Sequence, residues 1–288
     1  MAANCEYEPD PRWGESSPTH NPHILANFKA RASDIIISTS PKCGTTWMQQ
    51  ILHQLKTGGD DSFNAIDDVA PWLEVNRQGR HFAEVNSLFE KLPNPRIFKT
   101  HCTYEQAPGT DIARFILSTR DPRDACVSFY YHVMNLTEET RRQTHVSRPE
   151  NFEEYFENWL ESRVWYRNIS SWWPHRNRDN VLILRYEDLV SDFETSIERI
   201  VKFLQWKIAE DRKKTIMEFC SFNWMKEYSD RFTHRDESGN LFFVTGSFIR
   251  RGRVGDYRQL LSETQQKRIL ETAKEELESS CLDFLGLN

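Results

Sequence analysis

Long apolar runs are missing from this chain of 288 residues. No stretch approaches the about 20 consecutive apolar residues that a membrane-spanning helix needs, so we expect no association with a membrane. The N-terminal stretch MAANCEYEPDPRW has neither a basic start nor an apolar core, and it therefore does not resemble a secretory signal. Cysteine is scarce as well, and no CxxC pair occurs among positions 5, 43, 102, 126, 220 and 281. These cysteines indicate reduced thiols in a cytoplasmic protein and no metal site.

A surplus of basic residues is also absent, because 37 Lys and Arg face 43 Asp and Glu and give a net charge of -6. Nonspecific binding of nucleic acid is therefore not expected, and any anion site must be a local cluster of basic side chains. Repeats, low-complexity tracts and a Pro/Gly linker are missing too, which favours one domain. We expect an extended N-terminal arm at 1–31 and the domain itself at 32–288.

Short apolar runs alternate with longer amphipathic stretches along the chain. Strands are predicted at 34–39, 93–101, 113–120 and 180–189. Helices are predicted at 45–55, 122–136, 152–176, 191–205, 209–219 and 262–281. Loops are predicted at 58–68, 135–150 and 239–257. The alternation predicts an α/β fold with a P-loop-like central parallel sheet that is flanked by helices.

The sequence SPKCGTTW, residues 40–47, follows the first strand and opens a helix, which is how phosphate-binding loops are built. Gly44 lets the backbone approach a ligand closely, Thr45 and Thr46 add hydroxyl donors, and Lys42 adds a charge. Taken alone, Lys42 is as well explained by a solvated lysine, and Thr45 by a simple helix cap. The usual nucleotide loop has its Lys after the second Gly, and no acidic strand end is evident to hold Mg²⁺, so ATP hydrolysis is disfavoured.

Basic residues stand at the ends of three predicted strands. Lys42, the pair Lys99 and His101, and Arg120 are far apart in sequence, but the carboxyl ends of parallel strands meet at one edge. Lys99 and His101 are two residues apart, so both point to the same face of a strand. We therefore expect one anion site at this edge.

Five stretches resemble, in the same order, the motifs of the cytosolic sulfotransferase family. TSPKCGTTW (39–47) is similar to its 5′-phosphosulfate loop, and IFKTH (97–101) to the strand with its catalytic Lys and His. FILSTRDPRDACVSFYYH (115–132) resembles its 3′-phosphate segment, in which Ser128 follows Arg120 by eight residues. LRYEDL (184–189) and GSFIRRGRVGDY (246–257) resemble its other two motifs. The resemblance covers most of the chain between about residues 30 and 260.

The resemblance implies in-line transfer of a sulfuryl group from 3′-phosphoadenosine 5′-phosphosulfate (PAPS) to a hydroxyl or amine of a small-molecule acceptor. The desulfonated product is 3′-phosphoadenosine 5′-phosphate (PAP), and lysines rather than a metal neutralise the leaving group. The resemblance implies that His101 is the general base and that Lys42, Lys99 and Ser128 are further catalytic residues. The nucleotide site that it implies consists of Lys42, Cys43, Gly44, Thr45, Thr46, Trp47, Arg120, Ser128, Tyr186, Ser221, Phe222, Phe248, Ile249, Arg250, Arg251 and Gly252.

The acceptor pocket is implied to use Trp72, Phe129 and His132, where His132 replaces a frequent Phe and predicts a more polar pocket. Glu138 and Glu139 either face a cationic acceptor or are solvated. Cys43 stands where Ser is common and predicts an oxidation-sensitive loop. Charged Glu263 and Lys267 replace residues of the family's dimer contact, so we expect a monomer or a weak dimer.

Two other functions compete with this interpretation. A kinase-like phosphotransferase needs a Gly-Lys-Thr order and Mg²⁺ ligands, and the sequence shows neither. A nucleotide-binding module without activity would not need both Lys99 and His101. Tight binding of PAP would distinguish a sulfotransferase from a kinase. Turnover would distinguish an enzyme from an inactive binding module.

Overall fold

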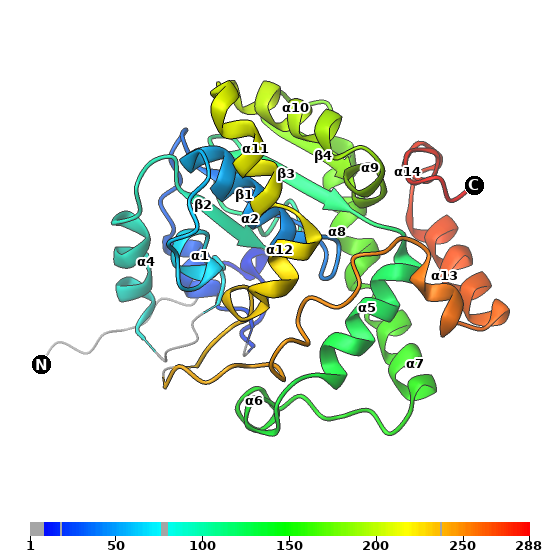
Figure 1. The fold of residues 1–288 in the computed structure, drawn as a ribbon. Coiled ribbons are helices and arrows are strands. Elements are labelled where there is room, and N and C mark those ends of the chain that lie inside the picture. Colours follow the sequence, from blue (N-terminus) through cyan, green and yellow to red (C-terminus); the bar gives the residue numbers. More distant parts are fainter. Residues whose placement is uncertain (1–8, 18, 76–79, 237) are drawn as a thin grey trace, which may run out of the picture.

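A four-stranded parallel sheet lies at the centre of the computed structural model, which describes residues 9–17, 19–75, 80–236 and 238–288 (Figure 1). The strand order is β2-β1-β3-β4, and all neighbouring strands run parallel. The strands are β1 (Ile35–Ser38), β2 (Ile97–Thr100), β3 (Arg114–Thr119) and β4 (Val181–Arg185). The register pairs Ser38 with Thr100 and Thr119 with Arg185, so the carboxyl ends of the strands form one edge. The α/β class and the presence of the four strands are confirmed, but the fourth strand was predicted too long, since residues 186–189 belong to a helix, α9 (Tyr186–Ser191).

Helices cover both faces of the sheet because its side chains alternate between two apolar clusters. Ile35 and Ile37 belong to one cluster, and Ile36 between them belongs to the other. The first cluster includes residues of α2 (Thr45–Thr57), α10 (Phe193–Leu204) and α11 (Glu210–Phe219). The second includes residues of α1 (Pro22–Asn27), α4 (Phe82–Glu90), α5 (Pro122–Met134), α7 (Phe152–Ser162), α8 (Val164–Trp172), α13 (Glu263–Glu276) and α14 (Ser279–Leu285). Figure 1 shows α10 and α11 on one side of the sheet, and α5 and α7 on the other.

Two predicted helices are each divided by a short stretch of different backbone conformation. The helix predicted at 152–176 breaks at Arg163, whose left-handed φ of 54° separates α7 from α8. The helix predicted at 262–281 breaks at Leu277 and Glu278, whose extended backbone separates α13 from α14. The shorter helices are α3 (Ile66–Val69), α6 (Glu138–Thr144), α9 (Tyr186–Ser191) and α12 (Phe222–Glu227), with 3₁₀ turns at Pro11–Trp13, Trp173–His175, Ser229–Arg231 and Asp256–Gln259.

The predicted loop at 135–150 contains α6, so that prediction was wrong in its middle. Thr137 caps the helix by accepting a hydrogen bond from the backbone N–H of Thr140 at 3.2 Å. Glu138 and Glu139 on its first turn are largely exposed and pair with arginines of the same helix. The solvated interpretation of these two carboxylates is the correct one.

The predicted extended arm also contains a helix. Asn21 caps α1 by accepting from the N–H groups of His23 and Ile24, and Ile24 and Leu25 are fully buried in the core. Residues 22–27 therefore pack on the domain, while the boundary at residue 31 stays a prediction. The loop predicted at 58–68 likewise ends in α3, and α4 was not predicted.

The cysteines of the described residues are buried and unpaired, at positions 43, 102, 126, 220 and 281. Within the described ranges, no helix combines the length and the apolar character that crossing a bilayer requires.

Candidate active site

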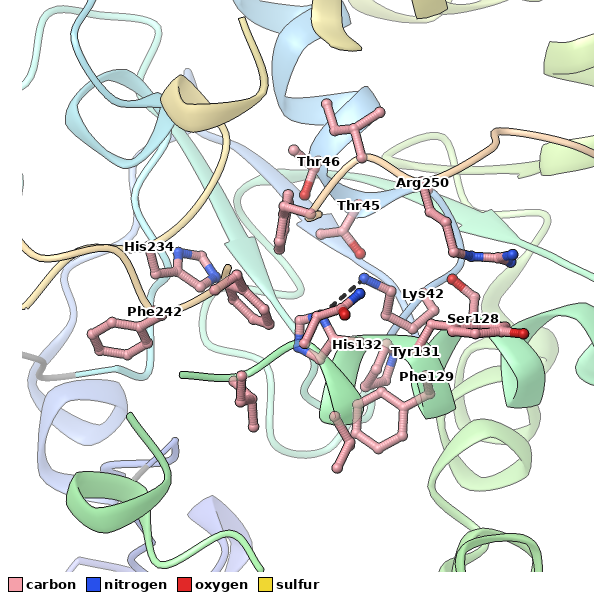
Figure 2. Close-up of a pocket in the computed structure, with 18 of the residues that line it drawn as sticks. Lys42, Thr45, Thr46, Ser128, Phe129, Tyr131, His132, His234, Phe242 and Arg250 are labelled. Atoms are coloured by element: carbon pink, nitrogen blue, oxygen red, sulfur yellow. Dashed lines mark hydrogen bonds between the residues drawn. The ribbon is translucent and has the colours of Figure 1, made fainter. Parts of the chain in front are cut away.

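A cavity of about 830 Å³ lies at the carboxyl edge of the sheet (Figure 2). The segment after each strand contributes to its wall: the loop after β1 with Lys42, then His101 after β2, Arg120 after β3 and Tyr186 after β4. The strand ends that the sequence indicated as chemically interesting therefore meet in one place, as expected for an open parallel sheet.

Nearly all the residues predicted for the site line this cavity. They are Lys42, Gly44, Thr45, Thr46, Trp47, Trp72, Lys99, His101, Arg120, Ser128, Phe129, His132, Tyr186, Phe222, Phe248, Ile249, Arg250, Arg251 and Gly252. Cys43 and Ser221 are not among the lining residues. Ser221 caps α12 by accepting from the N–H of Trp224 at 3.2 Å. The Cys43 thiol is fully buried, which raises its pKa to about 12 and argues against the predicted oxidation sensitivity.

The loop between β1 and α2 brings backbone N–H groups to the cavity. Gly44 has a φ of 94°, and a Cβ added there would lie 2.9 Å from Cδ2 of Tyr186, so the position requires glycine. No side chain caps α2, and the N–H groups of its first turn have no intrahelical partner. Lys42 also has a positive φ, of 68°, which a lysine rarely adopts. This geometry suits an anion at the start of α2.

Several basic side chains surround the same space, among them Lys42, Lys99, Arg120 and Arg250. Burial, followed by the charges of Lys99, Arg120 and Arg250, lowers the pKa of Lys42 to about 7. Arg120 donates to the carbonyl of Arg253 at 2.8 Å and lies 4.5 Å from the centre of the Tyr186 ring, but its buried Nε has no hydrogen-bond partner among the described residues. Asp124 lies 3.7 Å from Arg120, and Asp256 pairs with Arg250. The Nε of Arg120 is therefore the donor that is left for an anionic ligand.

The loop at 246–257 is attached to the domain at both ends. Asp124 of α5 accepts from the N–H groups of Gly255 and Tyr257 at 2.7 and 3.0 Å, and Lys226 donates to the carbonyl of Gly246 at 2.7 Å. The predicted clamp residues Arg250 and Arg251 both pair with Asp256. A Cβ on Gly252 would lie 2.7 Å from Phe222, so this loop approaches α12 closely.

His101 is held in one tautomer. Its Nδ1 lies 2.6 Å from the carbonyl oxygen of Thr39, which can only accept, so Nδ1 carries the proton and Nε2 is an acceptor. The backbone N–H of His101 donates to Glu74 Oε1 at 2.8 Å, and the Trp72 ring stands edge-on at 4.9 Å between centroids. Burial, followed by the charges of Lys99 and Lys42, lowers the pKa of His101 to about 3. The imidazole is therefore neutral at neutral pH and can accept a proton at Nε2.

Each lysine of the cavity contacts a histidine. Lys42 Nζ lies 3.1 Å from Nδ1 of His132, as the dashed line in Figure 2 shows. Lys99 Nζ lies 3.4 Å from Nε2 of His234, whose Nδ1 lies 2.7 Å from Oδ2 of Asp67. The sequence indicated His132 but not His234 or Asp67, because a lone His in RFTHRD and an Asp in a predicted loop carry no motif.

Apolar side chains form the part of the cavity that lies away from the cations. They include Phe129 and Val133 of α5 and Phe242 and Phe243 of the segment after α12, and α6 adds Thr140, Gln143 and Thr144. Of the phenylalanines at this end, only Phe129 was predicted from the sequence. Phe242 and Phe243 lay in a predicted loop, where no periodic pattern marked them.

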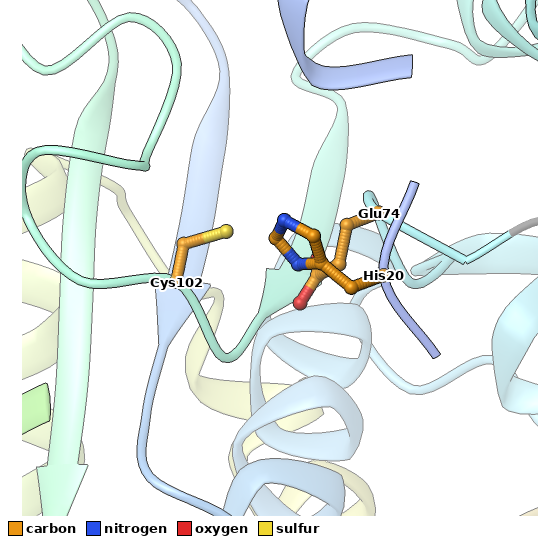
Figure 3. A group of neighbouring side chains, drawn as sticks. All are labelled: His20, Glu74 and Cys102. Carbon is orange, nitrogen blue, oxygen red and sulfur yellow. The ribbon is translucent and has the colours of Figure 1, made fainter. Parts of the chain in front are cut away.

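One cluster brings together residue types that ligate metals: His20, Glu74 and Cys102, whose candidate ligand atoms lie within 4.8 Å of one another (Figure 3). Two of these side chains already have protein partners, since His20 Nε2 contacts the carbonyl of Trp13 at 2.5 Å and Glu74 Oε1 accepts from His101. The cluster joins the N-terminal segment to the wall behind His101, and we assign it this structural role.

Comparison with known proteins agrees with this geometry. The model of the sulfotransferase domain matches residues 32–280. Sulfotransferase 1C2 of Homo sapiens is 28% identical over 273 residues, covering 90% of this chain and 88% of that protein. The amine sulfotransferase of Oryctolagus cuniculus is 30% identical over 274 residues, covering 91% and 86%.

Solved structures share the fold at lower identity. The mouse sulfotransferase SULT7A1, crystallised with PAP, superposes with a TM-score of 0.70 at 22% identity and covers 93% of both chains. Retinol dehydratase, crystallised with androsterone and PAP, gives a TM-score of 0.70 at 20% identity and covers 88% of this chain and 83% of that one. Because the domain model matches most of the chain, this protein belongs to the sulfotransferase family.

Proposed function

We propose that the protein transfers a sulfuryl group from PAPS to a hydroxyl or amine of a small-molecule acceptor, with His101 as general base. The observation that carries the proposal is the convergence of Lys42, Lys99 and Arg120 with a neutral, tautomer-fixed His101 in one cavity. The names of similar proteins support it, since two of the solved structures were crystallised with PAP and one relative is an amine sulfotransferase.

The nucleotide would be held by the cationic half of the cavity. The first turn of α2, with Thr45 and Thr46, suits the 5′-phosphate, and Lys42 lies beside it. Arg120, with its unpartnered Nε, suits the 3′-phosphate together with Ser128 and Arg250. Trp47 has one face against Phe193, at 5.3 Å between centroids and 9° between planes, and adenine would stack on the other.

The chemistry is divided between the two ends of the cavity. His101 takes the acceptor proton at Nε2 while the acceptor oxygen or nitrogen bonds to sulfur. Lys42 stabilises the negative charge that collects on the bridging oxygen as the S–O bond to the phosphate breaks, and Lys99 contacts the sulfuryl oxygens. When bound, the anionic donor also offsets the charges of Lys99 and Lys42, which depress the pKa of His101, so the imidazole becomes a stronger base where it is needed.

The decisive experiment combines binding and turnover. PAP is titrated into the protein by calorimetry against ADP, and sulfuryl transfer from labelled PAPS is measured with a panel of phenols, alcohols and amines. We expect PAP to bind more tightly than ADP and at least one acceptor to be sulfated. Equal affinity for PAP and ADP, or no transfer to any acceptor, would contradict the proposal.

The role of His101 is tested by His101→Ala across acceptors of different pKa. A loss of about 10²- to 10⁴-fold in turnover is expected, with PAP affinity nearly unchanged, because a base meets the acceptor and not the phosphates. Nitrophenols, which release their proton easily, should lose less than alcohols. A uniform loss for all acceptors, or a collapse of PAP binding, would mean that the base lies elsewhere.

A further inference from the structure

Asp67, His234 and Lys99 form a chain of contacts that the proposed chemistry does not yet use. Asp67 lies on α3, Lys99 on β2, and His234 in the segment after α12, so three distant parts of the sequence meet there. His234 and Lys99 are 7% and 3% exposed, and both line the cavity. In Figure 2, His234 approaches the cavity from the side opposite Ser128 and Arg250.

The positions of the protons in the Asp67–His234–Lys99 contacts can be assigned from the groups that can only accept. The Asp67 carboxylate accepts, so the 2.7 Å contact places the proton of His234 on Nδ1 and leaves the lone pair of Nε2 facing Lys99 at 3.4 Å. The nearest carboxylate oxygen of Asp67 lies 4.0 Å from Lys99 Nζ. The ammonium group of Lys99 therefore donates to the neutral ring of His234. The Asp67 carboxylate contacts the other nitrogen of that ring.

The closer partner of Lys99 is the His234 ring at 3.4 Å, and the Asp67 carboxylate lies farther away, at 4.0 Å. A carboxylate in close contact would compete with the anionic donor for the ammonium group, whereas a neutral imidazole accepts one hydrogen and brings no opposing charge. The carboxylate fixes the ring, as a second partner does for a metal-bound or catalytic histidine.

We propose that His234, fixed by Asp67, is a positioning residue that aims the Lys99 ammonium at the reacting sulfuryl group. This role rests on the proposed function. It predicts that His234 acts on turnover through Lys99, and that it does not contribute to nucleotide affinity.

The first test substitutes His234 in two ways. His234→Leu removes both contacts, and kcat at saturating PAPS and acceptor should fall about 10- to 100-fold, as for the loss of one hydrogen bond to a charged group. His234→Gln should recover most of that loss, since its amide can donate to Asp67 and accept from Lys99. PAP affinity should stay at the wild-type value in both variants.

The protein offers a matched control in a second buried histidine that contacts a partly exposed aspartate. His53 of α2 contacts Asp60 at 3.2 Å, and neither residue lines the cavity. His53→Leu removes a contact of the same kind, so it should change thermal stability without changing kcat. An equal drop in kcat for His53→Leu and His234→Leu would overturn the positioning role.

A double-mutant cycle separates positioning from a structural effect. In a Lys99→Met background, His234→Leu should cause no further loss in single-turnover rate, because the group that it orients is gone. The same fold loss in both backgrounds would overturn the role. Asp67→Asn, which keeps the size of the side chain, should give a smaller loss that is also non-additive with His234→Leu, and it serves if His234→Leu does not fold.

The outcomes distinguish this role from the proposed function. If the wild-type protein transfers no sulfuryl group, the proposed function is refuted and the role falls with it. If the wild type is active and His234→Leu is equally active, only the role is refuted.

Discussion

The two lysine–histidine contacts of the cavity differ in what lies behind the histidine. Behind His234 lies the Asp67 carboxylate at 2.7 Å, which fixes one tautomer and one ring orientation. Around His132 lie the rings of Phe129, Phe243 and Phe248, with centroids at 5.7, 4.5 and 5.9 Å. Rings pack against an imidazole but give its nitrogens no directed partner. We infer that Lys99 is held for the ligand, while Lys42 rests on His132 and exchanges that contact for a phosphate when the nucleotide binds.

The strongest way to break this comparison is to remove each amine in turn. Lys99→Met and Lys42→Met should each lower kcat by about 10²- to 10³-fold, the usual cost of losing one preorganised donor to the transition state. Only Lys42→Met should also weaken PAP binding, by about 10-fold, because in the proposed binding mode Lys42 and not Lys99 lies beside a phosphate. Single-turnover rates and calorimetry check this, and a Lys99→Met variant that loses as much PAP affinity as Lys42→Met would contradict it.

Removing Arg120 tests the phosphate side alone. Arg120→Ala should weaken PAP binding by about 10- to 100-fold, the range for hydrogen bonds to charged groups, and should reduce the preference for PAP over ADP. Arg178→Ala is a suitable control, since Arg178 is an exposed arginine that does not line the cavity. Equal affinity of Arg120→Ala and the wild type for PAP would refute the assignment of the 3′-phosphate.

Proton uptake on PAP binding tests the proposed exchange of partners at Lys42. Because the pKa of Lys42 is lowered to about 7, most of the free protein has a neutral amine at about pH 8. A phosphate beside the amine raises that pKa, so PAP binding should take up close to one proton. Calorimetry in buffers of different ionisation enthalpy counts it. Lys42→Met should abolish the uptake, and the same uptake in this variant would show that another group titrates.

The smallest expected effect comes from His132→Phe. Without the histidine, Lys42 no longer gives up a contact on binding, so PAP affinity should rise about 2- to 10-fold, the worth of one ordinary hydrogen bond. His234→Leu should leave PAP affinity unchanged. If both substitutions shift it equally, the two pairs are equivalent and the comparison fails.

Most of the sheet and the cationic end of the site were predictable from sequence, because both depend on local signals. Ile35–Ser38 is a β-branched run before a Gly-Thr-Thr turn, and the parallel topology carries the strand ends to one edge. The predicted residues Lys42, Lys99, His101 and Arg120 accordingly line the same cavity. Their chemical roles stay predictions until the experiments above are done.

The parts that sequence missed depend on contacts between distant segments. His234 and Asp67 come close to Lys99 only because the fold brings α3 and the segment after α12 together. The break at Arg163 was also hidden, because the apolar spacing continues on both sides of it. The direction of the Cys43 side chain was not predictable either: the motif places the residue in the loop, but the thiol packs inward, and its part in the nucleotide site stays a prediction.

Because the Cys43 thiol packs inward, its rate of chemical modification can report on opening of the loop around it. Burial raises the pKa of the thiols at 43, 102, 126, 220 and 281, so each is protonated and covered in the folded state and reacts slowly with thiol reagents. With Cys5 changed to Ser, the modification rate of Cys43 measures how often the loop that begins α2 opens. A nucleotide bound to that loop should slow the modification of Cys43. The modification rate of Cys281, in α14, should stay unchanged.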